Sequence, residues 1–219
     1  MLPSEVRTAV TLRIAQIYES IQGEGLLIGT PSVFIRIQGC NLRCSWCDQP
    51  ESLNFNGGQS IPLIEVIKKA ISYSPRHAVI TGGEPFTSQH LHRLVESLIE
   101  RGFTVQIETN GTLFNPEMER FKGSIHITCS PKGAARYYVH PSILKIASEL
   151  KFVVDEEFRE EVVLRSEFRR LLEEGKVVLQ PESNRNEMLK KALKIQKSLV
   201  SKGFGVRVIP QVHKFLGIP

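Results

Sequence analysis

The stretch Cys40-Asn41-Leu42-Arg43-Cys44-Ser45-Trp46-Cys47 places three cysteines at positions i, i+4 and i+7. Thiolates with this spacing share one face of a helix, and they also converge if the segment wraps as a loop around a compact inorganic core. Iron–sulfur clusters of the four-iron type are held by cysteine thiolates and usually take four of them. The local set supplies three, so one iron of such a cluster would stay open to an exogenous ligand.

A zinc site and a chance arrangement are the alternatives for this cysteine spacing. A structural zinc site normally has four closed ligands, often in two separated pairs, whereas the remaining cysteine, Cys129, lies alone in an apolar run. Cys129 is typical of a small buried hydrophobe in a strand. Used as a fourth ligand, it would close the open iron, and we do not expect it to bind a cluster. The spacing alone leaves cluster, zinc and chance open.

The residues around the cysteines favour the cluster. A strand-like run, Val33-Phe34-Ile35-Arg36-Ile37, precedes them, and an aromatic residue, Trp46, stands directly before the last cysteine. This arrangement resembles the radical S-adenosylmethionine (SAM) superfamily, in which the open iron binds the amino and carboxylate groups of SAM. The resemblance implies a 4Fe-4S cluster held by Cys40, Cys44 and Cys47, with SAM as the second cofactor.

Length and composition indicate one globular domain spanning residues 1–219. A chain of 219 residues with 41% hydrophobic content can bury one substantial core. It has no run of about twenty apolar residues that could span a bilayer, and residues 1–10 lack the apolar stretch of a signal peptide. We therefore expect a cytoplasmic protein with no membrane partner, in a compartment where thiols stay reduced and can hold iron.

The formal net charge of +5 raises the question of nucleic acid. The basic residues are interspersed with acids, as in the run 169–174, which is typical of solvated helix faces. We therefore expect no nucleic-acid partner. A mild positive field would instead favour an acidic electron donor or an anionic substrate.

Strand-like and helix-like patterns alternate along the chain. The predicted strands are 12–18, 33–37, 78–81, 104–108, 124–129, 151–154, 177–180 and 205–209. The predicted helices are 61–72, 91–101 with Gly102 as its C-terminal cap, 160–174 and 186–202, and the loop 54–59 reads as a solvated turn. This alternation predicts an α/β fold with right-handed crossovers and a parallel sheet. With roughly six such strands, the expected architecture is a partial (β/α)6 TIM-like barrel of the radical SAM type.

In such barrels the chemistry gathers at the carboxyl ends of the strands. Polar turns stand at four of these ends: Gly82-Gly83-Glu84-Pro85, Glu108-Thr109-Asn110-Gly111, Ser130-Pro131-Lys132 and Gln180-Pro181-Glu182-Ser183. Turn chemistry alone could explain any one of them. Four in succession favour a binding site, and the superfamily uses the first kind of turn to receive the amino group of SAM.

One family within the superfamily resembles this chain more closely. Its N-terminal motif is similar to Tyr18-Glu19-Ser20-Ile21-Gln22-Gly23-Glu24-Gly25 followed by Gly29, Pro31, Phe34 and Arg36. Its later motifs are similar to Ser130-Pro131-Lys132, to Gln180-Pro181 and to the tail 211–219, Gln-Val-His-Lys-Phe-Leu-Gly-Ile-Pro. On these residues the chain resembles the 7-carboxy-7-deazaguanine synthase family over nearly its whole length.

This resemblance implies a lyase that converts 6-carboxy-5,6,7,8-tetrahydropterin to 7-carboxy-7-deazaguanine with loss of ammonia, toward queuosine or archaeosine. The radical formed from SAM would remove a hydrogen atom from C6 of the pterin, and SAM would be regenerated. No side chain is expected to act as a catalytic acid or base. An electron donor such as flavodoxin or ferredoxin and a homodimer are also implied.

The resemblance assigns site residues by position. The expected substrate contacts are Ile21, Gln22, Gly23, Arg36, Thr81 and the carboxylate of Pro219. The expected SAM contacts are Trp46, Gly83, Glu84, Glu108, Asn110, Ser130, Pro131, Lys132, Gln180, Pro181, Glu182 and Ser183. The tail 211–219 would close the pocket, with Phe215, Leu216 and Ile218 buried. Arg36 suits the substrate carboxylate because a guanidinium binds a carboxylate through two hydrogen bonds.

The chain departs from the family at one position. Family members that use magnesium often place a threonine after the Cys-Asp pair, whereas Gln49 follows Cys47-Asp48 here. The carbonyl oxygen of a glutamine can bind a hard cation, but it reaches further than a hydroxyl group. Gln49 is therefore the expected ligand if Mg²⁺ binds, bridging to the substrate carboxylate.

Two other functions are alternatives. One is an activating enzyme of the same superfamily that installs a glycyl radical in a partner protein; nothing in it requires the Gln22-to-Gly25 stretch or the tail. The other is a zinc-holding RNA-binding module, which would be colourless and bind RNA in a salt-sensitive manner.

Overall fold

The computed structural model describes residues 10–219. The expectation about a leader at residues 1–10 therefore lies almost wholly outside the described residues. The strands are β1 Thr11–Ile21, β2 Pro31–Ile37, β3 Gln59–Pro62, β4 His77–Gly82, β5 Thr104–Thr109, β6 His126–Cys129, β7 Glu149–Val154, β8 Val177–Pro181 and β9 Val206–Val208. The helices are α2 Leu63–Ile71, α3 Leu91–Ile99, α4 Pro141–Ile146, α5 Glu160–Val163, α6 Arg169–Glu173, α7 Asn186–Ser201 and α8 Val212–Leu216. Short 3₁₀ turns are η1 Pro50–Ser52, η2 Pro85–Thr87, η3 Pro116–Phe121, η4 Gly133–Ala135, η5 Ser166–Phe168 and η6 Glu182–Asn184.

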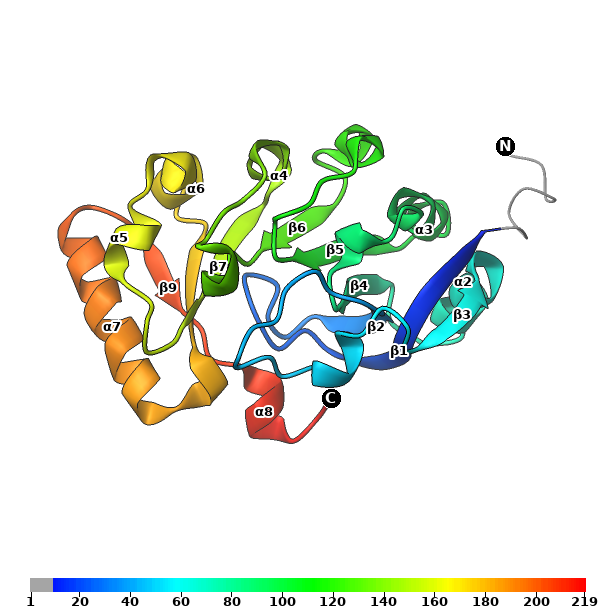
Figure 1. Cartoon of the computed structure of the whole chain (residues 1–219), viewed down its shortest axis with the longest axis horizontal. Helices are drawn as coiled ribbons and strands as arrows, with labels where there is room; N and C mark the ends of the chain where they lie inside the picture. The colour runs from blue at the N-terminus through cyan, green and yellow to red at the C-terminus, as the bar shows by residue number, and fades with distance from the viewer. Residues whose placement is uncertain (1–9) are drawn as a thin grey trace.

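All nine strands belong to one sheet, in the order β3-β1-β2-β4-β5-β6-β7-β8-β9. The strands from β2 to β9 in this order pair in parallel, while β1 pairs antiparallel with both β2 and β3. Helices α3, α4, α6 and α7 follow one another around the outside of the curved sheet, and α8 lies apart on its open side (Figure 1). The predicted parallel α/β sheet and open partial barrel are confirmed.

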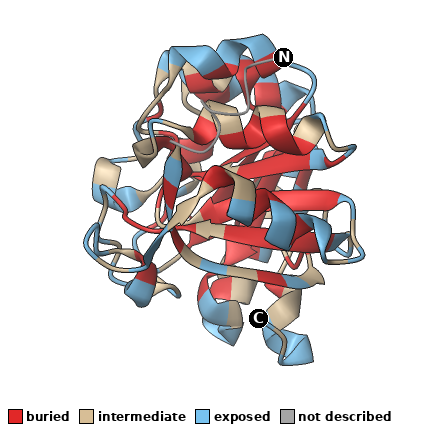
Figure 2. Cartoon of the chain, turned by 90° about the vertical axis from the view of Figure 1, so that its right-hand side faces the viewer, coloured by how far each residue is buried: buried red, intermediate tan, exposed pale blue. Residues whose placement is uncertain are grey.

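The core lies between the sheet and its outer helices. Helix α3 buries Leu91, Leu94, Val95 and Leu98, the period expected of an amphipathic helix. It ends where Gly102 takes a positive φ of 78° and Phe103 donates its N–H to the carbonyl of Leu98, a left-handed cap that glycine adopts without strain. The inner strands of the sheet, such as β4, β7 and β8, are almost wholly buried (Figure 2).

Two predicted elements differ from the structure. The range 61–72 is not one helix, because residues Gln59–Pro62 form β3 against β1 and α2 begins at Leu63. The helix predicted over 160–174 breaks at Arg165, whose backbone is extended (ψ 143°). This break lets Phe168 turn inward onto Phe152, with ring centroids 5.4 Å apart. Burial of an aromatic ring stabilises the fold more than one unbroken turn of exposed helix does.

Candidate functional site

A pocket opens at the carboxyl ends of the parallel strands. Of the described residues predicted to form the site, all line it except Glu84, Pro131 and Pro181. The pocket therefore brings together the three cysteines, the polar strand ends and the end of the chain. Contacts with particular ligands remain predictions.

The cysteine loop supplies one half of the pocket. Cys40, Cys44 and Cys47 all line it, and the N–H of Cys47 donates to the carbonyl of Cys44 (3.2 Å). Burial raises the pKa of the Cys40 and Cys44 thiols, and coordination to a metal deprotonates such thiols outright. Cys129 is fully buried in β6 and is not among the described residues that line the pocket. The donor set fits a cluster with three protein ligands.

Three long-range contacts fix the cysteine loop to the sheet. Trp46 donates its indole N–H to Oδ2 of Asp155 (2.7 Å), and the Lys132 ammonium lies 5.3 Å from the centre of the Trp46 ring. Asn110 donates its amide to Oδ1 of Asn41 (3.0 Å). The loop thus rests on the ends of β5, β6 and β7. The polar turns after β5 and β6 were predicted to bind SAM, whereas Asp155 after β7 was not predicted.

The Gly-Gly-Glu-Pro turn after β4 has a structural reason for its glycines. A Cβ at Gly83 would overlap the carbonyl of Gly39, and Gly82 has a φ of 116°. The turn therefore packs directly against the strand that leads into the cysteines. Glu84 differs from its predicted place: its carboxylate is buried and accepts from the N–H groups of Phe86 and Asn110 and the hydroxyl of Thr109. It holds the turn and does not face the pocket.

An arginine and two stacked aromatic rings form the opposite wall. Tyr18 stacks on Phe34, with centroids 5.2 Å apart and planes 9° from parallel. Arg36 donates from Nη2 to the Tyr18 hydroxyl (2.6 Å), and its buried Nε has no hydrogen-bond partner among residues 10–219. A buried unsatisfied donor is costly, so the guanidinium is suited to an acidic ligand. Tyr18 was not among the predicted site residues, although it opens the family motif.

Gln22 lies in the pocket with its amide already engaged. Nε2 donates to Oε1 of Gln106 (2.9 Å) and to Oε1 of Glu108 (3.2 Å), and Oε1 accepts the N–H of Glu24 (3.1 Å). The amide therefore shapes the loop that carries Gly23 and Glu24, rather than reaching freely toward a ligand.

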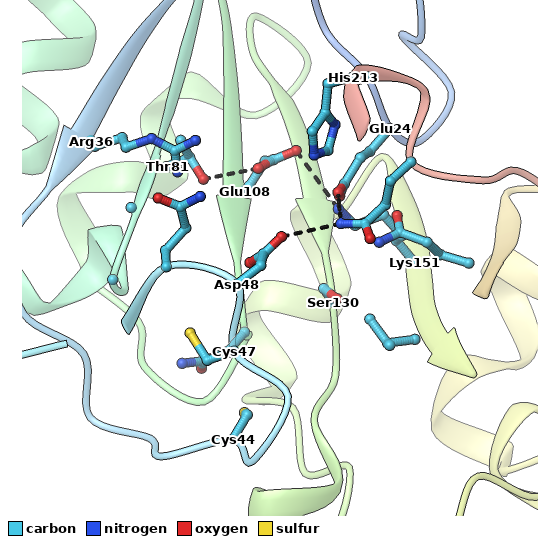
Figure 3. Close-up of a pocket in the computed structure, with 18 of the residues that line it drawn as sticks. Glu24, Arg36, Cys44, Cys47, Asp48, Thr81, Glu108, Ser130, Lys151 and His213 are labelled. Atoms are coloured by element: carbon cyan, nitrogen blue, oxygen red, sulfur yellow. Dashed lines mark hydrogen bonds and ion pairs between the residues drawn. The ribbon is translucent and has the colours of Figure 1, made fainter. Parts of the chain in front are cut away.

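Sequence reasoning missed a buried ion pair at the centre of the pocket. Lys151 contacts Glu24 directly, and its Nζ lies 3.8 Å from Glu108, which in turn accepts a 2.8 Å hydrogen bond from Thr81 (Figure 3). Burial alone would raise the pKa of Glu24, but the charge and hydrogen bond of Lys151 lower it to about 2. The same carboxylates raise the pKa of Lys151 against the effect of its burial. A signal was available, since Glu149 and Lys151 alternate in an otherwise apolar strand.

Polar contacts hold the tail at the pocket, which is lined by Gln211, His213, Lys214 and Pro219. Gln211 donates from Nε2 to Glu24 (2.7 Å) and Asp48 (3.1 Å), and Ser20 donates to the main-chain oxygen of Pro219 (2.9 Å). The expected burial of the three apolar tail residues was wrong, because Phe215 and Leu216 on α8 are 68% and 57% exposed and Ile218 is only half-buried. Helix α8 is only about one turn long and lies at the pocket opening. One of its faces therefore contacts the protein, and the other is left in solvent.

Three further side chains of the pocket could hold a cation. Ligand atoms of Glu24, Asp48 and His213 lie within 4.8 Å of one another, and Gln49 lines the same pocket. His213 was not predicted as a site residue; it comes from the tail and packs against Gly23.

Comparison with known proteins identifies the family. The radical SAM superfamily model matches residues 34–152. The chain is 62% identical over 215 residues to the 7-carboxy-7-deazaguanine synthase of Aquifex aeolicus (98% of each chain) and 33% identical over 214 residues to that of Methanospirillum hungatei (95% of this chain, 86% of the relative).

Solved structures agree with this assignment. QueE from Escherichia coli superposes with a TM-score of 0.74 at 26% identity, covering 97% of this chain and all of that one. SuiB of Streptococcus suis bound to S-adenosylmethionine shares the fold, with a TM-score of 0.56 at 14% identity over 79% of this chain and 48% of its own.

Within residues 10–219, none of the helices has the length and apolar character needed to cross a membrane. The relatives favour the synthase over the glycyl-radical activating enzyme and the zinc-holding module. The chain belongs to the 7-carboxy-7-deazaguanine synthase family of the radical SAM superfamily.

Proposed function

We propose that this pocket converts 6-carboxy-5,6,7,8-tetrahydropterin to 7-carboxy-7-deazaguanine with release of ammonia. Family membership makes the chain a radical SAM lyase. The observation that carries the proposal is one cavity in which three thiols face a wall holding an unsatisfied arginine and the chain terminus. A bound cluster with SAM supplies the radical that starts the ring contraction.

The test is an anaerobic incubation of the reconstituted protein with SAM, a reductant and the carboxytetrahydropterin. We expect 7-carboxy-7-deazaguanine and ammonia in equal amounts, detected by mass spectrometry and an ammonia assay. An activating enzyme would cleave SAM without forming the deazaguanine. A colourless protein holding one zinc would contradict both enzyme functions.

In the SAM half of the pocket, the strand-end residues bind and orient the cofactor. Gln180 is buried, and its Oε1 accepts no hydrogen bond within the described part of the chain. An orphaned acceptor facing a cavity is suited to an N–H or O–H donor, which SAM has on its amino group and ribose. The other groups proposed here are Trp46, Gly83, Glu108, Asn110, Ser130, Lys132, Glu182 and Ser183, all of which line the pocket.

In the substrate half, Arg36 binds the pterin carboxylate through its free donors while Tyr18 holds the other side of the guanidinium. Ile21, Gly23 and Thr81 complete the proposed contacts. The stacked Tyr18 and Phe34 rings and the tail exclude water from the reacting ring, which protects a reactive intermediate.

Removing Ile218 and Pro219 is expected to raise KM for the pterin about tenfold or more, because Pro219 lines the pocket and the terminal carboxylate would move to Gly217, two residues back along the tail. SAM cleavage in the absence of the pterin should remain. Ser20→Ala removes only the hydroxyl that anchors the terminus and should give a smaller rise in KM. Steady-state kinetics measure both; an unchanged KM in the truncated protein would place the terminus outside the substrate site.

We further propose that Gln49 would hold Mg²⁺ beside the substrate carboxylate, whose charge the ion would partly neutralise. Gln49→Ala should then raise the Mg²⁺ concentration for half-maximal turnover by about tenfold. Asp48→Asn is the comparison variant, because Asp48 belongs to the neighbouring group with Glu24 and His213. A large effect of Asp48→Asn with none from Gln49→Ala would move the ion to that group, and turnover independent of Mg²⁺ would refute the site.

Three properties of the working enzyme complete the proposal. An acidic one-electron donor such as flavodoxin or ferredoxin suits the net charge of +5 and the exposed Arg43 in the cysteine loop. The four cysteines are free thiols, which suits the reducing cytoplasm. The family resemblance also predicts a homodimer.

A further inference from the structure

A chain of buried side chains lies beneath the loop that carries Gly23 and Glu24. It consists of Gln22, Gln106, Thr128 and Glu149, which we call the floor network. Each of the four is at most 1% exposed. None of the last three was predicted from the sequence or lines the pocket in the described structure, so their role must be indirect.

The hydrogen bonds of the floor network run in one direction. Thr128 donates its hydroxyl to Oε1 of Glu149 (2.6 Å) and accepts from Nε2 of Gln106 (2.9 Å). Oε1 of Gln106 accepts from Nε2 of Gln22 (2.9 Å). Oε1 of Gln22 then accepts the main-chain N–H of Glu24 (3.1 Å).

The Glu149 carboxylate at one end of the floor network sets that direction, because a carboxylate only accepts hydrogen bonds. Glu108, which also accepts from Nε2 of Gln22 (3.2 Å), favours the same direction at the other end. With Glu149 accepting, Thr128 must donate to it, and the amide group of Gln106 must turn its NH₂ toward Thr128. The Gln106 carbonyl therefore faces Gln22. The NH₂ of Gln22 points toward that carbonyl, and the carbonyl of Gln22 faces the N–H of Glu24. Reversing any member would place two donors or two acceptors against each other.

Glu149 also holds the same loop directly. Its Oε2 accepts the N–H of Leu26 (2.9 Å), and a Cβ at Gly25 would lie 2.7 Å from Oε1. Gly25 has a φ of 66°, a conformation that glycine adopts readily. The carboxylate therefore fixes residues on both sides of Gly25, one through the floor network and one by contact. His126 is the third hydrogen-bond partner of this carboxylate, with Nε2 2.9 Å from Oε1.

We propose that Glu149 is a positioning residue that sets the affinity for the pterin by orienting the loop 22–26. Glu24 lies two residues after Gln22 on this loop, and it connects Lys151 to the tail residue Gln211. The pterin side of the pocket therefore depends on Glu149, whereas the SAM side is held by a different buried carboxylate, Glu84. The role assigned here rests on the proposed function.

Glu149→Gln is the sharpest test, because an amide has the shape of the carboxylate but an NH₂ in place of one oxygen. It therefore cannot accept hydrogen bonds from both Thr128 and Leu26, as the two oxygens of Glu149 do. If its NH₂ faces Leu26, two donors meet there. If its NH₂ faces Thr128, the Thr128 hydroxyl can no longer donate to residue 149. Either that hydroxyl loses its acceptor, or the floor network reverses, which turns the Gln22 carbonyl toward Glu108 and its NH₂ toward the N–H of Glu24. Each arrangement removes a hydrogen bond from the loop or from the network that holds it, and the expected result is a rise of about tenfold in KM for the pterin.

Glu84→Gln is the matched control, since it makes the same change in a carboxylate that is equally buried. We expect it to weaken SAM binding while Glu149→Gln leaves the SAM dissociation constant and the iron content near those of the wild type. Hydrogen exchange followed by mass spectrometry should show faster exchange at residues 22–30 in Glu149→Gln. Merely structural damage would instead lower the folded fraction and both affinities together.

Thr128→Val removes the hydroxyl that links Glu149 to Gln106 and keeps the hydrogen bond from Leu26 to Glu149. It therefore tests the floor network even if Glu149→Gln fails to fold. A rise of about threefold in KM is expected, and the double variant should not multiply the two effects, because they share one chain. Unchanged KM and unchanged exchange at 22–30 in both variants would overturn the inference. If the wild type forms no deazaguanine, the proposed function fails, and the exchange experiment still decides the role of Glu149.

Discussion

Cys44→Ala is expected to lose 7-carboxy-7-deazaguanine formation and reductive SAM cleavage completely. Cys44 is one of the three thiols in the pocket, and a four-iron cluster left with two protein ligands has no stable attachment. Iron content after anaerobic reconstitution and SAM cleavage measured by chromatography report the loss.

Cys129→Ala is the matched control for this experiment. Cys129 lies fully buried at the end of β6, where its removal leaves a small cavity that costs about 1 kcal/mol. Its iron content and turnover should match those of the wild type. Retained iron in Cys44→Ala, or lost iron in Cys129→Ala, would show that the ligand set has been assigned wrongly.

Lys151→Met is expected to destabilise the protein by about 3–5 kcal/mol and to remove most of its activity. Its ammonium is 6% exposed and balances the carboxylates of Glu24 and Glu108; removing one partner of a buried ion pair leaves the other charge unpaired. Denaturant unfolding of the cluster-loaded protein measures the loss. Lys68→Met is the control, because Lys68 pairs with Glu65 in solvent and should change stability by less than about 0.5 kcal/mol.

Two further results separate this charge effect from loss of packing. Glu24→Gln combined with Lys151→Met should recover part of the stability, because it removes one unpaired charge. In the wild type the pKa of Glu24 lies at about 2, below its ordinary value of 4.5. The stability from its ion pair is therefore fully present above pH 4.5 and is lost as the pH falls toward 2. In Lys151→Met this dependence should reverse, because burial raises the pKa of Glu24 once the ammonium is gone, so that stability is lost as the pH rises. A double variant no more stable than Lys151→Met would contradict the charge explanation.

The sequence predicts those parts of the fold that follow from local pattern. Helix α3 was expected from its apolar period and its glycine cap, and the strand ends at Thr81 and Glu108 were expected from short apolar runs followed by polar turns. The four-residue strand β3 was not expected, because its only order comes from pairing with β1. The break at Arg165 likewise depends on a distant aromatic contact with Phe152.

The same distinction applies to the site. The cysteines could be found because their spacing alone indicates convergence. The ion pair between Glu24 and Lys151 joins residues 127 positions apart, and no periodicity relates them. Gln22 was expected to contact the substrate, and in the structure its amide donates hydrogen bonds to Gln106 and Glu108. These partners are distant in the sequence, so only the tertiary structure reveals the bonds. Phe215 was predicted to be buried from its apolar character alone, and it is exposed. An apolar residue in a short tail need not be buried.

The measurement that tests the central claim most directly is electron paramagnetic resonance of the anaerobically reconstituted, reduced protein before and after addition of SAM. We predict about four irons and four sulfides per chain and a spectrum that changes when SAM binds at the iron without a protein ligand. A spectrum that SAM leaves unchanged would contradict three-cysteine ligation with an open iron, as would a colourless protein holding one zinc.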